Sequence, residues 1–202
     1  MEQITIREYT AADETAWVRC RVISFLDCSY WNDVKREKER YPHPSISLVA
    51  DAGGMIVGLI DGELDSEDLT VRDHGRGAMV WHMAVLPEYR RFGVGMALWK
   101  EMEKRLMGMG VTHCELWTQE DTAANQFYQR MGLRLQPEHT WLRCYADAKH
   151  RTLLVDRDRL GSIYGVEELV FGAKPEDRER LRPLCHRIDE VRLYTKELSG
   201  ET

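Results

Sequence analysis

The sequence has few cysteines, and their spacing argues against the two commonest structural uses of this residue. Five cysteines are scattered over 202 residues, and no C-x-x-C pair occurs. A disulfide framework needs an even set at regular spacing, and a structural zinc site needs closely paired ligands. We therefore expect no disulfide framework and no metal. Most of the cysteines should be buried as small apolar residues; they are Cys20, Cys28, Cys114, Cys144 and Cys185.

Long apolar runs and an excess of positive charge are also missing. The sequence has no run of about 18 apolar residues, so it predicts no membrane span. Residues 1–5 lack the apolar segment of a signal peptide. The net charge of −6 gives no general attraction to nucleic acid or to an anionic membrane. We expect a soluble, cytoplasmic protein whose partners include neither nucleic acid nor a membrane.

What the chain does contain is enough apolar material for a core. It is 43% hydrophobic and 31% charged, which excludes a disordered chain. Its length suits one domain with an appendage. We place a domain at 1–148 and a C-terminal extension at 149–202, packed on the domain or on a second subunit. From His150 onward the extension has ten Lys/Arg and eleven Asp/Glu, so it is nearly neutral.

Periodicity predicts the elements, because strands alternate every two residues and helices repeat every 3.6. The segment 33–40 is almost wholly charged, and is either an exposed short helix or a loop. Residues 133–135 begin a strand, and 141–145 are its predicted hairpin partner. The remaining strands are expected at 4–8, 45–50, 55–63, 78–86, 111–118, 152–155 and 191–194, and helices at 14–26, 93–109, 121–131 and 175–181.

The strongest functional signal is the segment 80–98, where an apolar strand passes through a turn rich in Arg and Gly into a long helix. A helix N-terminus leaves backbone N–H groups unpaired and carries partial positive charge, so it binds phosphate. Gly93 and Gly95 let a ligand approach the backbone closely. Arg90 and Arg91 add charge-assisted donors. The turn therefore predicts a pyrophosphate ligand.

Two rival phosphate-binding motifs match this turn less well. A P-loop requires Gly-Lys-Ser/Thr, and a dinucleotide-binding fingerprint requires a third glycine and an acid about 20 residues on. An ordinary strand-turn-helix, in which the glycines only shape the turn, is the structural alternative.

The whole string resembles the acyl-CoA signature of the GNAT N-acetyltransferase superfamily. That signature is Arg/Gln-x-x-Gly-x-Gly/Ala behind a strand ending in Val-x-Pro, and here Arg90-x-x-Gly93-x-Gly95 follows Val85-Leu86-Pro87. Residues 124–133 resemble the family's Ala…Phe-Tyr-x-x-x-Gly-Phe segment. The resemblance covers about residues 3–145.

The resemblance implies an α/β (α+β) GNAT fold, with a mixed, mostly antiparallel sheet of about six or seven strands and helices on both faces, plus the extension. In that fold the strand before the glycine turn splays from the next one, and pantetheine fills the gap. Acetyl-CoA is the implied co-substrate, and a homodimer is the implied assembly. The implied coenzyme-binding residues are Met83, Val85, Arg90, Arg91, Gly93, Val94, Gly95, Met96, Asn125 and Tyr128.

The resemblance also gives Tyr128 the role of the acid that protonates the departing thiolate. The family commonly has Asn seven residues before this Tyr to hold the coenzyme. Asp121 occupies that place here, and Asn125, three residues before Tyr128, is the alternative.

The general base is open between three residues. An alkylamine is mostly protonated at pH 7, so the site must remove a proton before attack. Glu63 is the first candidate because it belongs to an acidic cluster, His82 is the second, and Glu115 lies on the next strand. Each has a structural alternative: a solvated strand-end acid for Glu63, a hydrogen-bonded core imidazole for His82 and a surface residue for Glu115.

The acidic cluster spans Asp61 to Asp73, with six acids and one base. It is either a solvated loop or the lining of an acceptor site that attracts a cation. Tyr30, Trp31 and Tyr41 lie where many family members build that site. We expect an N-acetyltransferase that moves acetyl from acetyl-CoA directly to a primary amine of a small molecule or peptide. The alternatives are a catalytically silent acyl-CoA-binding sensor or interaction module, and an enzyme with another acyl donor or an O-acceptor.

Overall fold

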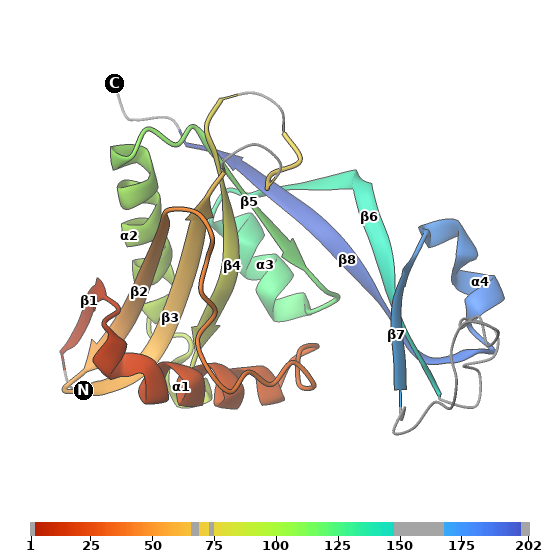
Figure 1. Ribbon diagram of the computed structural model, residues 1–202, viewed down its shortest axis with the longest axis horizontal. Helices are drawn as coiled ribbons and strands as arrows, with labels where there is room; N and C mark the ends of the chain where they lie inside the picture. Colours follow the sequence, from red (N-terminus) through yellow and green to blue (C-terminus); the bar gives the residue numbers. More distant parts are fainter. Residues whose placement is uncertain (1–2, 66–68, 73–74, 148–167, 199–202) are drawn as a thin grey trace. The chain divides into compact units, whose positions relative to one another are not determined.

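A computed structural model describes residues 3–65, 69–72, 75–147 and 168–198 (Figure 1). The chain divides into two compact units. The first contains Met1–Trp117, Asp121–Arg134 and Tyr194–Thr202, and the second contains Thr118–Glu120 and Leu135–Leu193. The domain boundary expected between 148 and 149 stays a prediction. The strand expected at 152–155 lies outside the described residues.

The strands form one mixed sheet in the order β1-β2-β3-β4-β5-β8-β6-β7. Neighbours from β1 to β4 are antiparallel, and β4 and β5 are parallel. The mixed, mostly antiparallel fold is therefore confirmed, although eight strands are described where six or seven were expected. The strands of the first unit are β1 (Ile4–Glu8), β2 (Ser45–Ala52), β3 (Met55–Leu64), β4 (Gly77–Val85) and β5 (His113–Thr118), joined by the end of β8 (Cys185–Glu197).

The helices of the first unit are α1 (Glu14–Leu26), α2 (Val94–Gly108) and α3 (Thr122–Arg130), as expected from periodicity. None of the helices in the described ranges combines the length and the apolar character needed to cross a membrane. The segment 27–44 between α1 and β2 contains no helix, so the charged run 33–40 is a loop.

The helices α1 and α2 cover opposite faces of the sheet (Figure 1). A Cβ at Gly62 would lie 3.1 Å from Met102 Sδ of α2, so Gly62 faces that helix. Side chains alternate along a strand, and Asp61 and Glu63 therefore face α1. This alternation sets the two acids on the face of the sheet where the candidate site is built.

In the second unit, β6 corrects the expected hairpin. Residues 133–135 and 141–145 are not partners, because Arg134–Asp147 is one continuous strand. The turn expected between them is absent because Pro137 suits extended backbone, its φ being fixed near −65°. In the sheet, β6 lies between β8 and β7 (Glu168–Ala173), and its pairing with β7 is antiparallel. Leu142 and Cys144 of β6 pack with Leu181 of α4 (Arg178–Leu181).

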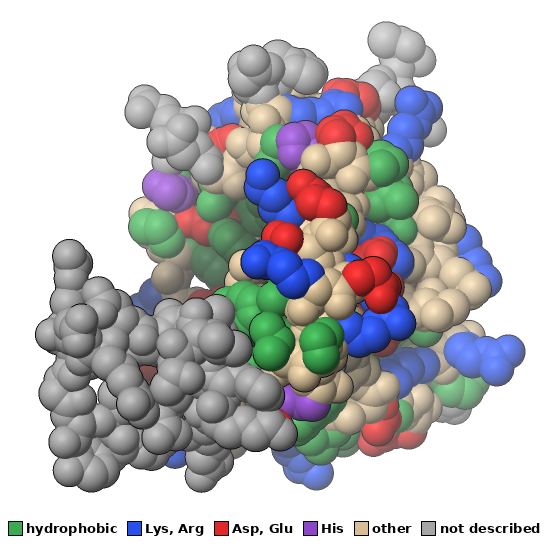
Figure 2. All heavy atoms as spheres, turned by 90° about the vertical axis from the view of Figure 1, so that its right-hand side faces the viewer, with side chains coloured by type: hydrophobic (Ala, Val, Ile, Leu, Met, Phe, Trp, Pro, Cys, Tyr) green, Lys and Arg blue, Asp and Glu red, His purple; other side chains and the backbone are tan. Residues whose placement is uncertain are grey.

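Charges of both signs lie interspersed on the face shown in Figure 2. Around α4, Arg180 pairs with Asp177 and Arg182 pairs with Glu179, each at 3.0 Å. The described part of the extension therefore presents mixed charge, as its composition predicted.

Asp13, at the start of α1, is bonded to Arg7 of β1, and this contact should make the stability of the fold depend on pH. Arg7 donates to both carboxylate oxygens at 2.8 Å, and this bond holds the pKa of Asp13 well below its usual range. A lowered folded-state pKa stabilises the fold above the unfolded pKa and loses that effect as pH falls. Asp13→Asn should lower the free energy of unfolding at pH 7 by about 1–2 kcal/mol.

Urea unfolding at a series of pH values checks this. The difference in free energy of unfolding between wild type and Asp13→Asn should begin to shrink below about pH 4. It should keep shrinking as the carboxylate of the wild type is protonated. A gap of constant size from pH 7 down to about pH 2 would show that the charge of Asp13 adds nothing.

Candidate active site

The turn between β4 and α2 has an open helix N-terminus. Gly93 is the residue that precedes α2, and its φ of +82° lies in the left-handed region that favours glycine. Arg91 also has a positive φ, of +68°. A Cβ at Gly93 would meet no atom of the described residues within 4 Å. This side of Gly93 therefore has room for a ligand beside the first turn of α2, whose N–H groups have no partner within the helix.

The two arginines of the turn differ. The Arg90 guanidinium donates to the Val85 carbonyl at 3.1 Å and to the Ser24 carbonyl of α1 at 2.8 Å. Arg91 is exposed and makes no hydrogen bond or ion pair within the described ranges. The sequence predicts the same role for both arginines, whereas in the structure Arg90 fixes the turn and Arg91 has no partner among the described residues.

The parallel ladder between β4 and β5 is short. Its register pairs Gly77 with His113, Ala78 with Cys114 and Met79 with Glu115, and it ends there. The rest of β4, which includes Met83 and Val85, pairs with β3 on its other side. The two strands therefore separate toward the glycine turn, as the fold expectation required.

Gly95 brings the turn, β4 and α3 together. A Cβ at this position would lie 3.4 Å from Met83 Cε and 3.4 Å from Phe127 Cε2. An added Cβ would thus already be in van der Waals contact with both side chains. Of the other predicted coenzyme residues on α2, Val94 is buried in the core and Met96 is 43% exposed.

Tyr128 lies on α3 with a partly buried side chain. Its ring contacts the rings of Phe127 and Tyr194, with centroids 5.7 and 6.0 Å away. Burial raises the pKa of Tyr128, with smaller contributions from Tyr30 and Asp121. Its hydroxyl has no hydrogen-bond partner in the part of the chain that the structure describes. A phenol is protonated at neutral pH, and this O–H is not used by another residue in the described part of the chain.

The start of α3 uses both residues that were considered for the coenzyme. Asp121 Oδ1 accepts from the Ala124 N–H at 2.8 Å, which caps the helix. Asn125 is buried, donates to the Asp121 carbonyl at 2.7 Å and accepts from the Tyr194 hydroxyl at 2.9 Å. Both residues thus support α3, and a coenzyme contact of Asn125 stays a prediction.

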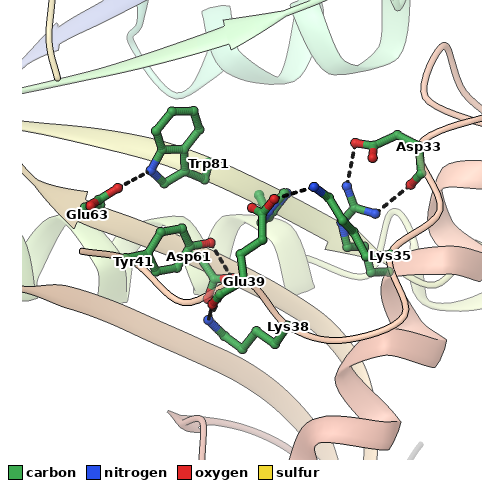
Figure 3. A network of polar contacts seen from close by, with 10 residues as sticks. Asp33, Lys35, Lys38, Glu39, Tyr41, Asp61, Glu63 and Trp81 are labelled. Carbon is green, nitrogen blue, oxygen red and sulfur yellow. Dashed lines mark hydrogen bonds and ion pairs between the residues drawn. The ribbon is translucent and has the colours of Figure 1, made fainter. Parts of the chain in front are cut away.

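Glu63 is buried, so its structural alternative as a solvated strand-end acid is wrong. Its Oε2 accepts from Trp81 Nε1 at 2.7 Å (Figure 3). Its Oε1 lies 2.9 Å from His43 Nδ1. Trp81 is the extra residue of a bulge in β4, because Asp61 pairs with His82 and Gly62 pairs with Val80. The bulge thus positions the Trp81 indole for its hydrogen bond to Glu63.

His82 is also buried, and its partner is a residue that sequence reasoning missed. His82 Nε2 lies 2.7 Å from Glu39 Oε2, and the imidazole meets the Trp17 ring edge-on at 5.8 Å. The hydrogen bond with His82, with help from Lys35, lowers the pKa of Glu39 to about 2. Glu39 was hidden in a charged run, where nothing in the local pattern marks one acid as turned inward.

Glu115 is buried as well, so it is no surface residue. It accepts from the N–H groups of Val71 and Arg72 at 2.7 and 3.1 Å. Asp65 likewise accepts from the Leu69 N–H at 3.1 Å. These two acids hold the segment 69–72. Three other acids of the cluster, Glu67, Asp68 and Asp73, lie outside the described residues.

Comparisons with known proteins agree with this geometry. Residues 6–133 match the acetyltransferase (GNAT) family. A curated Sodalis glossinidius acetyltransferase is 30% identical over 125 residues, which are 60% of this chain and 78% of that protein.

Solved structures show the same fold. The PaiA N-acetyltransferase of Thermoplasma acidophilum, in complex with coenzyme A, has a TM-score of 0.54 at 18% identity over 66% of this chain and 91% of that one. A Brucella melitensis GNAT acetyltransferase, in complex with acetyl-CoA, has a TM-score of 0.52 at 22% identity over 66% and 84%.

Proposed function

The chain belongs to the GNAT acetyltransferase family, and we propose that it transfers acetyl from acetyl-CoA directly to a primary amine. The observation that carries the proposal is the separation of β4 from β5 beyond Met79, which leads to the open N-terminus of α2 at Gly93. The gap beside β4 suits the extended arm of a ligand, and the helix N-terminus that follows it suits a diphosphate at the end of that arm. Acetyl-CoA has both parts.

In this proposal the N–H groups at Gly93 and Gly95 and the Arg91 guanidinium bind the diphosphate, and Met83 and Val85 line the pantetheine arm. The amine nitrogen attacks the thioester carbon, and a C–N bond forms while the carbonyl oxygen becomes an oxyanion. The C–S bond then breaks, and the Tyr128 hydroxyl gives its proton to the thiolate. The hydroxyl of Tyr128 supports this role, because a phenol is protonated at neutral pH and this one has no hydrogen-bond partner among the described residues.

We propose Glu63 as the base that accepts the proton of the amine. Its carboxylate is buried beside His43 and the bulge at Trp81, on the α1 face of the sheet. His82 is the rival, because Glu39 orients its imidazole as a carboxylate orients a catalytic histidine.

The two candidate bases give different pH profiles of the matched variants. Glu63→Gln should lower kcat/KM for an alkylamine by about 100-fold at pH 7. The loss should shrink toward about pH 10, where much of the amine is already neutral. Stopped assays from pH 6 to about 10 on Glu63→Gln and His82→Gln check this. If the pH-dependent loss belongs to His82→Gln, the base is His82.

Thiol release tests the overall proposal. Purified protein with acetyl-CoA and a panel of primary amines should release free CoA, and the product amine should gain the mass of one acetyl group. Binding of acetyl-CoA without CoA release across the panel would favour the binding module. A gain of mass on an alcohol, or only with another acyl-CoA, would favour the remaining alternatives.

A further inference from the structure

The ammonium of Lys38 lies among three aromatic rings. Its Nζ is 4.7 Å from the ring centroid of Tyr41, 5.3 Å from that of Tyr9 and 5.5 Å from that of Trp17. Asp61 Oδ2 completes the site at 3.3 Å. We call Tyr9, Trp17, Tyr41 and Asp61 the cage. Only 8% of the Lys38 side chain is exposed, so the cage holds a largely desolvated cation, the setting in which cation–π attraction is strongest.

Asp61 carries more acceptor capacity than Lys38 uses. The residue is fully buried, and Oδ2 accepts from the Tyr41 hydroxyl at 3.1 Å as well as from Lys38 (Figure 3). Its other oxygen, Oδ1, is buried without a hydrogen-bond partner among the residues that the structure describes. A buried carboxylate oxygen without a donor is costly. The cage can therefore satisfy a cation that brings another N–H.

The cage adjoins both candidate bases. Asp61 is paired with His82 across β3 and β4, and it lies two residues from Glu63 on the same face of the sheet. Glu39, the neighbour of Lys38, is hydrogen-bonded to His82. One short stretch of the loop 27–44 thus fills the cage and contacts a candidate base.

We propose that the cage binds a non-reacting ammonium group of the acceptor, and that Lys38 takes this place in the free protein. The inference rests on the proposed function. Aromatic faces and a carboxylate favour the charged form of an amine, whereas the attacking amine must be neutral. The caged group therefore anchors the acceptor while a second amine reacts. The acceptor class is then a diamine, a polyamine or another amine with a second alkylammonium.

Calorimetry with 1,4-diaminobutane tests the cage without requiring turnover. If Lys38 fills the cage in more than about nine molecules in ten, Lys38→Met should bind the probe at least about tenfold more tightly than wild type. Adding Asp61→Asn to Lys38→Met should abolish that gain. Arg36→Met is the matched control, because it removes an exposed charge from the same loop and should leave the affinity unchanged. Equal affinity of wild type and a folded Lys38→Met would overturn the proposal.

Kinetics keeps the proposal testable should Lys38→Met fail to fold. Wild type should prefer 1,4-diaminobutane over n-butylamine by at least about tenfold in kcat/KM, and Asp61→Asn should remove that preference while acetyl-CoA affinity stays unchanged. Turnover of both amines without preference would refute the cage and leave the proposed function intact. Absence of turnover with any amine would refute the proposed function, and the calorimetric result would still decide the cage.

Discussion

Acetyl-CoA affinity should fall by at least about 100-fold when Gly93 is replaced by Glu, as measured by calorimetry. Gly93 immediately precedes α2, has φ +82°, and has open space among the described residues where a side chain would extend. A carboxylate there would lie where we place the diphosphate, and a juxtaposed like charge costs several kcal/mol. It would also oppose the favourable field of the helix N-terminus.

Gly110→Glu is the matched control for this experiment. Gly110 follows the other end of the same helix and has φ +76°, and an added Cβ there likewise meets no atom of the described residues within 4 Å. Both variants therefore carry the backbone strain of a left-handed non-glycine residue, roughly 1–2 kcal/mol, and the same added charge. Only Gly93→Glu should lose acetyl-CoA. Equal affinities in the two folded variants would mean that the diphosphate binds elsewhere.

Tyr128→Phe should lower kcat by about 100-fold and leave the affinity for acetyl-CoA nearly unchanged. The substitution keeps the ring that contacts Phe127 and Tyr194 and removes only the hydroxyl. That hydroxyl has no partner to lose among the described residues, so the fold should tolerate the change. Single-turnover kinetics and calorimetry measure the two quantities separately.

Tyr145→Phe is the control for Tyr128→Phe, because it removes from the second unit a buried hydroxyl that has no hydrogen-bond partner in the described ranges. It should leave kcat unchanged. Because burial raises the pKa of Tyr128, the activity of wild type should not fall from loss of this proton below the ordinary tyrosine pKa of about 10. A kcat of Tyr128→Phe equal to that of wild type would assign the proton to water or another acid.

Much of the fold could be predicted because its signals are local. Helix α2 has a glycine start and an apolar stripe, and β1 to β5 alternate or run apolar between turn residues. The hairpin expected around Pro137 was wrong, because proline fits an extended strand as well as a turn. The strands that flank β6 are β7 and β8, which lie far along the chain, and no local pattern encodes such a pairing.

The candidate site was predictable where chemistry lies in one continuous segment, as in the glycine turn. It was not predictable where partners come from distant segments. Glu39 and Lys38 come from the loop 27–44, and their partners His82 and Asp61 come from the sheet. Within the charged run, nothing distinguishes Glu39 and Lys38 from their exposed neighbours. Burial of Glu63 and Glu115 likewise depends on which strands flank them.

The bulge at Trp81 changes how this strand must be compared with those of relatives. The extra residue shifts the inward and outward alternation of β4, so Val80 and His82 pair with adjacent residues of β3. In a relative without the extra residue, the side chains of this strand would alternate between the two faces of the sheet without a break. Positions near the reaction centre should therefore be aligned by counting back from Pro87, since counting forward from Gly77 would assign side chains to the wrong face.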